Sequence, residues 1–260
     1  MSHSLLHTYF KQRVKQVFNH LHDFDSSMSE TDLHDFRVEL KKMRAILKFL
    51  SKVYSKQKLK KSARLLSNIF QQAGDIREYQ ILLQWLDKSD MNELKNQCFP
   101  EHRMVEMIQH FQQQTHLFKL ELKEVVDQLS DFIKSTNSIL SEQYAIDLFA
   151  QINKIILKDC NASQWHDLRK RIKQWQYACN WVNEKDWNLE QAYFQKLQEA
   201  IGHWHDIETI QQNLVAQQKA YSNQIEVLKE ITKANQLLEK SNKLRKREVQ
   251  VLLTRKVISI

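Results

Sequence analysis

Glycine and proline are almost missing from this chain of 260 residues, which contains two glycines and one proline. Tight β-hairpin turns depend on such residues, so their scarcity excludes a β-rich fold and predicts an all-α protein. The same scarcity excludes the glycine-rich loops whose backbone approaches a phosphate closely. Any phosphate that this protein binds must therefore be held by side chains.

Cysteines and long apolar runs are scarce as well. The three cysteines, Cys98, Cys160 and Cys179, have no Cys-x-x-Cys spacing and are odd in number, which predicts neither a disulfide framework nor a zinc site. No run reaches the ~18 apolar residues of a membrane-spanning helix, and residues 1–10 lack the pattern of a signal peptide. We expect a soluble, reduced protein of the cytoplasm, with no membrane partner, no metal and no cofactor.

Positive charge is concentrated in two segments of the chain, whose formal net charge is +8. Between Arg37 and Arg64 there are eleven Lys or Arg residues and one acid, Glu39. A second basic segment, Lys240 to Lys256, has seven cations and one acid, so the chain outside the two segments is acidic. Such a concentration of one sign indicates a polyanionic partner.

Helical periodicity covers most of the sequence. The separators are short and polar, at 23–29, 89–100, 135–138 and 183–186, and predict antiparallel neighbours. The last helical stretch is too long for one ordinary helix, and Ser222-Asn223 is its expected break. The predicted helices are 4–23, 30–54, 57–73, 76–88, 102–134, 138–159, 162–184, 187–201 and 204 to about 255.

One motif occurs twice in the chain. The segments that begin at His34 and His166 both read His-Asp-apolar-Arg-x-x-apolar-Lys, 132 residues apart. A candidate N-cap, Ser29 or Asn161, precedes each histidine by five residues. The only two glycines follow downstream in Gly74-Asp-Ile-Arg-Glu and Gly202-His-Trp-His-Asp, where each is expected to be a left-handed helix C-cap.

These residues resemble the CHAD domains (conserved histidine α-helical domains), whose mark is a helix reading His-x-x-Arg-x-x-x-[Lys/Arg]-x-x-[Lys/Arg] in each of two halves. The first copy is complete, whereas the second departs from the pattern at Gln176-Tyr177. The resemblance spans roughly residues 5–255 of a single domain, with halves at about 4–134 and 138–255. It implies two four-helix bundles related by an internal duplication and pseudo-twofold symmetry, a basic central cavity, and binding of inorganic polyphosphate. The matching residues are His34, Arg37, Lys41 and Arg44, then His166, Arg169 and Lys173, with Gly74-x-x-Arg77-Glu78 and Gly202-x-x-His205-Asp206 as a second element.

The helix that carries His34 has a cationic side and an apolar side. At about 100° per residue, every third or fourth position from 34 to 52 falls on one side of the helix. That side contains no acid, although solvated faces usually mix signs because like charges at i, i+4 repel. An ordinary solvated face is the alternative, and we favour a bound polyanion. The six residues on this side are His34, Arg37, Lys41, Arg44, Lys48 and Lys52.

A second basic face, formed by Lys60, Lys61 and Arg64 on the next helix, is expected to converge on the first. The second half is weaker, because Gln176 and Asn180 stand on its cationic side. We therefore expect non-catalytic binding of polyphosphate, carried mostly by the first half; polyphosphate granules are one location that such binding would allow. The expected binding residues are His34, Arg37, Lys41, Arg44, Lys48, Lys52, Lys60, Arg64, His166, Arg169 and Lys173.

Two other functions remain open at this point. Nucleic acid would make the same phosphate contacts, and Tyr54, Tyr177 and Trp181 are expected near the polar side, where bases could stack. Most other aromatic residues, including Phe36, Phe70, Trp165 and Trp175, fall on core sides. A metal-dependent phosphohydrolase of the HD type is less favoured, because cations beside the His-Asp doublets would repel the metal. These doublets are His22-Asp23, His34-Asp35, His166-Asp167 and His205-Asp206.

Overall fold

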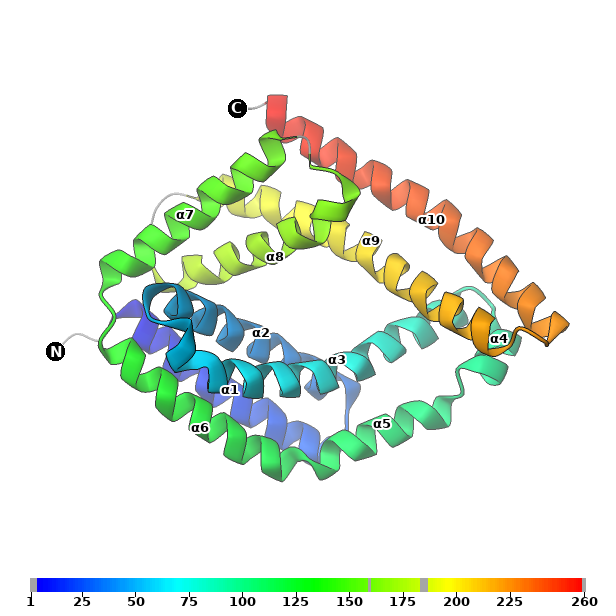
Figure 1. The fold of residues 1–260 in the computed structure, drawn as a ribbon, viewed down its shortest axis with the longest axis horizontal. Helices are drawn as coiled ribbons and strands as arrows, with labels where there is room; N and C mark the ends of the chain where they lie inside the picture. The colour runs from blue at the N-terminus through cyan, green and yellow to red at the C-terminus, as the bar shows by residue number, and fades with distance from the viewer. Residues whose placement is uncertain (1–3, 159, 183–186, 259–260) are drawn as a thin grey trace. The chain divides into compact units, whose positions relative to one another are not determined.

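The computed structural model describes residues 4–158, 160–182 and 187–258, and within them the protein is all-α, as predicted. Ten α-helices and two 3₁₀ turns make up these residues, and no strand occurs among them. The elements, shown in Figure 1, are α1 (Leu5–Ser27), α2 (Glu30–Val53), η1 (Lys56–Leu59), α3 (Lys60–Lys88), α4 (Asn92–Cys98), α5 (Glu101–Gln113), α6 (Thr115–Lys134), α7 (Ser138–Leu157), α8 (Ala162–Ala178), η2 (Cys179–Trp181), α9 (Asn188–Ala220) and α10 (Ile225–Ile258).

Both predicted N-caps are confirmed. The Ser29 side chain accepts hydrogen bonds from the backbone N–H groups of Thr31 and Asp32 at the start of α2. Before α8, the Asn161 side chain accepts from the Ser163 N–H, and the Gln164 side chain accepts from the Asn161 N–H. This reciprocal pair is a capping box, so the two motif helices begin where their sequences predict.

The predicted C-caps at the two glycines are wrong. Gly74 lies inside α3 and Gly202 inside α9, and neither has a positive φ. The predicted helix boundaries near 74 and near 202 therefore do not exist. Both glycines are buried, and their role is to leave space for a neighbouring side chain, as the site shows. The break predicted at Ser222-Asn223 is confirmed, since α9 ends at Ala220 and α10 begins at Ile225.

The stretch 89–100 is not a simple polar separator. It contains α4, and Met91, Leu94 and Phe99 are buried, so spaced apolar residues anchor this short helix. The helix predicted over 102–134 is divided at Gln114 into α5 and α6. The separator predicted at 183–186 lies outside the described residues.

The chain forms two compact units. The first contains the described parts of Met1–Arg77, Glu106–Phe149 and Gln174–Lys185, and the second contains those of Glu78–Val105, Ala150–Lys173 and Asp186–Ile260. Each unit therefore takes segments from both predicted sequence halves. The motif helix α2 belongs to the first unit, and most of α8 belongs to the second.

An aromatic cluster forms part of the core of the first unit. Phe111 contacts Phe24 of α1, Phe36 of α2 and Phe118 of α6, with ring centroids 5.4, 6.2 and 4.9 Å away. All four rings are buried. The apolar side of α2 is thus held in the core, and its cationic side points away from it.

In the second unit, α9 packs along α10 (Figure 1). Buried Leu197, Ile201 and Ile207 of α9 and Val227 and Leu238 of α10 contribute to this core. The polar residue Asn242 is also buried here and donates hydrogen bonds to Glu208 and Gln211 of α9. These bonds help to fix the register of α10 on α9.

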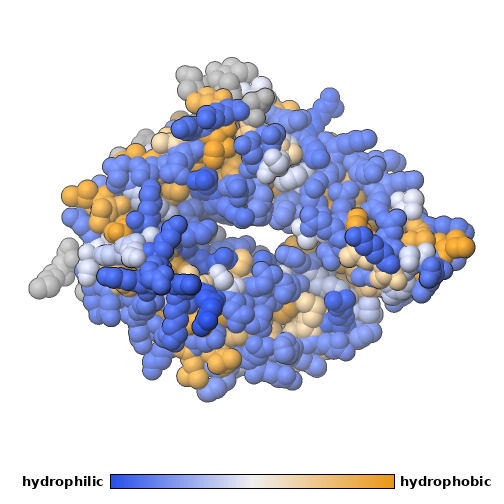
Figure 2. All heavy atoms as spheres, in the orientation of Figure 1, coloured by the Kyte–Doolittle hydropathy of each residue, from blue (hydrophilic) through white to orange (hydrophobic). Residues whose placement is uncertain are grey.

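The face drawn in Figure 2 is mostly hydrophilic, with small separate hydrophobic patches. None of the described helices combines the length and hydropathy needed to cross a membrane.

A buried ion pair connects α1 and α2. Arg13 and Glu39 are 8% and 5% exposed, and the Arg13 guanidinium donates to the Glu39 carboxylate at 3.0 Å. Lys42 binds the same carboxylate at 2.6 Å. The one acid of the basic segment is therefore neutralised in the interior, away from the cationic side of α2.

Removing Arg13 should be costly. Arg13→Ala leaves the Glu39 carboxylate buried with one cation instead of two, and we expect the free energy of unfolding to fall by about 3 kcal/mol. The control is Lys134→Ala, whose partner Asp131 is exposed, so a change within about 0.5 kcal/mol is expected. Urea denaturation measures both values, and equal effects of the two variants would contradict this account.

Candidate anion-binding site

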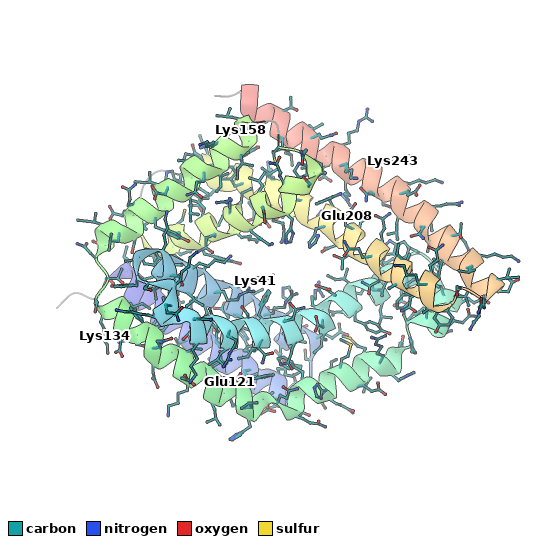
Figure 3. The ribbon with its side chains drawn as sticks, viewed as in Figure 1. Lys41, Glu121, Lys134, Lys158, Glu208 and Lys243 are labelled. Atoms are coloured by element: carbon teal, nitrogen blue, oxygen red, sulfur yellow. The ribbon has the colours of Figure 1, made fainter. Side chains whose placement is uncertain are left out.

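The cationic side of α2, here called the α2 stripe, consists of His34, Arg37, Lys41, Arg44, Lys48 and Lys52. The structure places all six on one side of an uninterrupted helix. Arg37, Lys41 and Arg44 in its middle are half-buried, whereas His34, Lys48 and Lys52 near its ends are exposed. Lys41 is labelled on α2 in Figure 3. The predicted stripe is thus an accessible row whose central cations are held by neighbouring residues.

Helix α3 supplies the support for the central arginines. The Phe70 ring lies under both guanidinium groups, with its centroid 4.8 Å from Cζ of Arg37 and 4.2 Å from Cζ of Arg44. One turn further along α3, a Cβ atom at Gly74 would lie 3.3 Å from Nη2 of Arg37. The missing side chain of Gly74 therefore makes room for the guanidinium, while cation–π attraction orients it.

The electrostatic environment of the α2 stripe is positive. Partial desolvation of the His34 ring lowers its pKa below the ordinary value, and the charges of Arg77, Lys41 and Arg37 lower it further, against Asp35. Burial also lowers the pKa of the Arg44 guanidinium. Arg77 belongs to α3, three residues after Gly74, so two helices bring cations to His34. A bound anion would relieve this repulsion.

The outer cations of the predicted site have acidic neighbours within the first unit. Lys52 forms an ion pair with Asp147 of α7 at 3.0 Å. Lys61 forms an ion pair with Glu124 of α6. Burial raises the pKa of Glu121, also on α6 (Figure 3), and nearby Arg64 opposes that rise. Lys60 and Arg64 are exposed. The face formed by Lys60, Lys61 and Arg64 is therefore directed partly toward α6. From α3, it is the charge of Arg77 that lowers the pKa of His34.

In the second unit, α8 and α9 repeat the arrangement of arginine and glycine. A Cβ atom at Gly202 would lie 3.1 Å from Nη2 of Arg169. The Nε–H of Arg169 donates to the Gln198 carbonyl at 3.1 Å. Gln198 lies one turn before Gly202, so the guanidinium rests against helix backbone that a side chain at 202 would cover.

A histidine pair stands where the first unit has His34 and Arg77. The rings of His166 and His205 have centroids 4.3 Å apart. The residues before them, Trp165 and Trp204, pack edge to face in the core at 5.1 Å. This core contact holds α8 and α9 together at the position where the two imidazoles meet.

Burial and neighbouring charge disfavour protonation of this pair. Burial, together with the neighbouring His205, Lys170 and Arg169, lowers the pKa of His166 to about 4. The pKa of His205 is lowered, mainly by burial, although Asp206 opposes the shift. Lys173 is half-buried, which lowers the pKa of its ammonium group. The face formed by α8 and α9 in the second unit, here called the α8–α9 face, thus has few fixed charges. Its two imidazoles are neutral in the empty protein.

Of the four His-Asp doublets, those at His166 and His205 meet between α8 and α9, whereas His22-Asp23 lies on α1 and His34-Asp35 lies on α2. Among the described residues, no three His, Cys, Asp or Glu side chains come together in a way that could hold a metal ion. Arg169 lies close enough to His166 and His205 to lower the pKa of each imidazole.

Three participants were missing from the predicted site. Arg77 and His205 both stand three residues after a glycine, and this shared spacing was the available signal. The sequence pattern predicts that Phe70 lies on a core side, but its ring is half-buried beneath two arginines. The expectation that Trp181 lies near the polar side is wrong, because it is buried against Tyr9 and Phe49. Tyr54 and Tyr177 are half-buried.

Residues 8–215, which include both motif helices and both glycines, match the family model of the CHAD domain. The chain belongs to the CHAD domain family. Within this CHAD domain, the order histidine, arginine, glycine and Gly+3 residue is the same in α2–α3 and in α8–α9.

A solved CHAD domain has the same fold. The crystal structure of the CHAD domain from the plant Ricinus communis is 16% identical to this chain and covers 94% of it, and the chain covers 89% of that structure, with a TM-score of 0.73. No curated protein matches the sequence.

The contact between Arg169 and Gly202 can be tested through stability. Replacing a helix-interior glycine by alanine gains about 1 kcal/mol where the new methyl group has space. In the wild type that methyl group must displace the Arg169 guanidinium from the Gln198 carbonyl. We therefore expect Gly202→Ala to raise the free energy of unfolding by about 1 kcal/mol more in an Arg169→Ala background than in the wild type. Urea denaturation of the four proteins measures the difference, and equal effects in both backgrounds would contradict the contact.

Proposed function

We propose that this CHAD domain binds inorganic polyphosphate without catalysing a reaction on it. The α2 stripe is the principal binding face, and Arg77 extends it from α3. The observation that carries the proposal is a row of cations on one side of α2 that contains no acid. The one acid of this basic segment, Glu39, is instead buried in the interior, where Arg13 and Lys42 bind it.

The arrangement suits a linear chain of phosphates. Charges on one side of a helix recur about every 5–6 Å, so successive side chains can neutralise successive parts of one polymer. The guanidinium groups of Arg37 and Arg44 are oriented in advance by Phe70, which reduces the entropy lost on binding. Arg presents several N–H donors in a plane and binds phosphate oxygens strongly.

Nucleic acid is the competing partner, and the aromatic residues favour polyphosphate. Single-strand binders leave aromatic rings accessible among their cations so that bases can stack. Here the Phe70 ring lies under Arg37 and Arg44, and the Tyr144 ring lies 5.5 Å from the Lys52 ammonium. A base would have to displace the protein's own cations, whereas a phosphate would not.

We infer that the second unit adds a weaker face and that both faces arose by internal duplication. The inference is supported by Arg37 against Gly74 and Arg169 against Gly202, with Gly+3 residues beside His34 and His166. The predicted halves at 4–134 and 138–255 and the basic central cavity stay predictions.

Competition between polymers tests the choice of ligand. At equal charge and matched salt, long-chain polyphosphate should bind more tightly than single-stranded DNA, because only DNA must accommodate bulky bases beside the α2 stripe. Calorimetric titration of the purified protein gives both dissociation constants. Equal or tighter binding of DNA would favour the nucleic-acid function instead.

Charge reversal tests the binding face itself. Lys41→Glu with Lys48→Glu removes two charge-assisted contacts worth about 1.5–3 kcal/mol each, so polyphosphate affinity should fall at least a hundredfold, by about 3 kcal/mol or more. The control is Lys123→Glu with Lys134→Glu, which changes the net charge equally on exposed positions of α6 and should have a much smaller effect. Circular dichroism checks the fold, and equal losses in both variants would mean that only overall charge matters.

Binding should depend on pH through the motif histidines. Burial and neighbouring cations hold the pKa of His34 below its ordinary value and that of His166 at about 4 in the empty protein. A bound polyanion favours the imidazolium and raises both pKa values, so binding takes up protons. Affinity should therefore rise as pH falls from about 7 to about 5, between the bound and the free pKa values.

His34→Gln with His166→Gln should flatten this pH dependence while leaving affinity at pH 8 nearly unchanged. The measurement uses long chains, in which terminal phosphates contribute little, at constant ionic strength. A wild-type affinity that does not vary with pH would remove both histidines from the site.

A further inference from the structure

Helix α10 carries a line of exposed apolar side chains that the α9–α10 core does not use. Leu237, Leu244 and Val251 recur every seven residues and are 38%, 64% and 46% exposed. Every seventh residue lies on nearly the same side of a helix, so the three form one continuous apolar line. The buried side of α10 is a different set of residues, Val227, Ile231, Ala234, Leu238, Asn242, Val249 and Leu253.

A groove lies between α9 and α10 beside this line. Its volume is about 590 Å³, and Leu244 and Val251 form part of its wall. Ala200 of α9 and Leu252 of α10 add further apolar surface. The rest of the lining consists of Lys196, Glu199, His203, Arg245, Arg247 and Glu248. The groove is therefore an apolar hollow with a charged rim.

The charge beside the groove is positive. Lys240, Lys243 and Arg247 are exposed on the side of α10 next to the apolar line (Figure 3 labels Lys243). Among the described side chains, none of these three cations forms an ion pair. Of the two carboxylates in the lining, Glu248 is bound by Arg245 at 2.8 Å and Glu199 accepts a hydrogen bond from Gln195.

The geometry favours a helix as the occupant. Side chains of a helix insert into a groove between two others, and a seven-residue spacing is the repeat that such packing requires. A protruding apolar face can instead insert into a lipid surface, and this does not require a fixed spacing of its side chains. A second copy of this chain would bring its own Lys240, Lys243 and Arg247 close to the same cations, and like charges would repel.

We propose that the groove between α9 and α10 is a docking site for an acidic amphipathic helix of a partner protein. The partner's apolar stripe packs on Leu237, Leu244 and Val251, and Asp or Glu residues beside that stripe face Lys243 and Arg247. All of α10 lies beyond the residues that match the CHAD family model, which end at 215. The site shares no residue with the α2 stripe or with His166, Arg169 and Lys173 of α8.

Two synthetic helical peptides test the proposal. Each has three heptads, with Leu at positions a and d; one has Glu at positions e and g, and the other has Lys there. Fluorescence anisotropy with the 260-residue protein should show the acidic peptide binding at least about tenfold more tightly than the basic one. Equal binding of the two peptides, or no binding of either, would overturn the proposal.

Variants separate the apolar contribution from the charge. Leu244→Gln with Val251→Gln should weaken binding of the acidic peptide at least about tenfold, whereas Leu189→Gln, at an 85% exposed position of α9, should not. Lys243→Glu with Arg247→Glu should reverse the preference between the peptides. These positions are exposed, so the fold should persist by circular dichroism. If binding of the acidic peptide were weakened by Lys243→Glu with Arg247→Glu but not by Leu244→Gln with Val251→Gln, the surface would be merely basic. That result would contradict a docking groove.

A vesicle experiment excludes the other class of partner. Co-sedimentation with phosphatidylserine vesicles, compared with phosphatidylcholine vesicles, should show no retention that depends on Leu244 and Val251. Retention that is lost in the Leu244→Gln and Val251→Gln protein would assign the surface to membranes and overturn the proposal.

Discussion

Repulsion among the cations of α2 is the constraint on which the site of the first unit depends. Arg37, Lys41 and Arg44 follow one another along one helix side, where like charges one turn apart destabilise a helix. The protein offsets this cost without placing a carboxylate between them: their side of α2 is free of acids, while the apolar side is fixed in the core and Glu39 is bound by Arg13 in the interior. A bound polyanion would relieve the remaining repulsion, which is the physical basis of the proposed polyphosphate binding.

The two units place different side chains beside the motif histidine. The first unit relies on fixed charges, with Arg77 beside His34, and its guanidinium groups are held by Phe70 and by the space at Gly74. The second has His205 beside His166, so its charge is small in the empty protein and would grow if a bound anion raised the imidazole pKa values. If the domain binds polyphosphate as proposed, the α2 stripe would supply most of the attraction, and the α8–α9 face would add a contribution that depends on pH.

Local patterns in the sequence predicted much of the fold and of the first face. Capping residues gave the starts of α2 and α8, and apolar spacing separated the core side of α2 from its cationic side. The roles of Gly74 and Gly202 could not be read locally, because each depends on an arginine that arrives from a preceding helix. The same holds for Phe70 and for the acids of α6 and α7 near Arg64 and Lys52. Contacts between distant segments decide these cases, and composition and periodicity carry no information about them.

The most direct test of the central claim is a crystal structure of the protein with long-chain polyphosphate. The account predicts successive phosphates within hydrogen-bonding distance of Arg37, Lys41 and Arg44, with both guanidinium groups still resting on Phe70. Polymer bound at the outer side of α10, or along Lys56 to Lys60 with the central α2 stripe empty, would contradict the claim that this side of α2 is the polyphosphate-binding face.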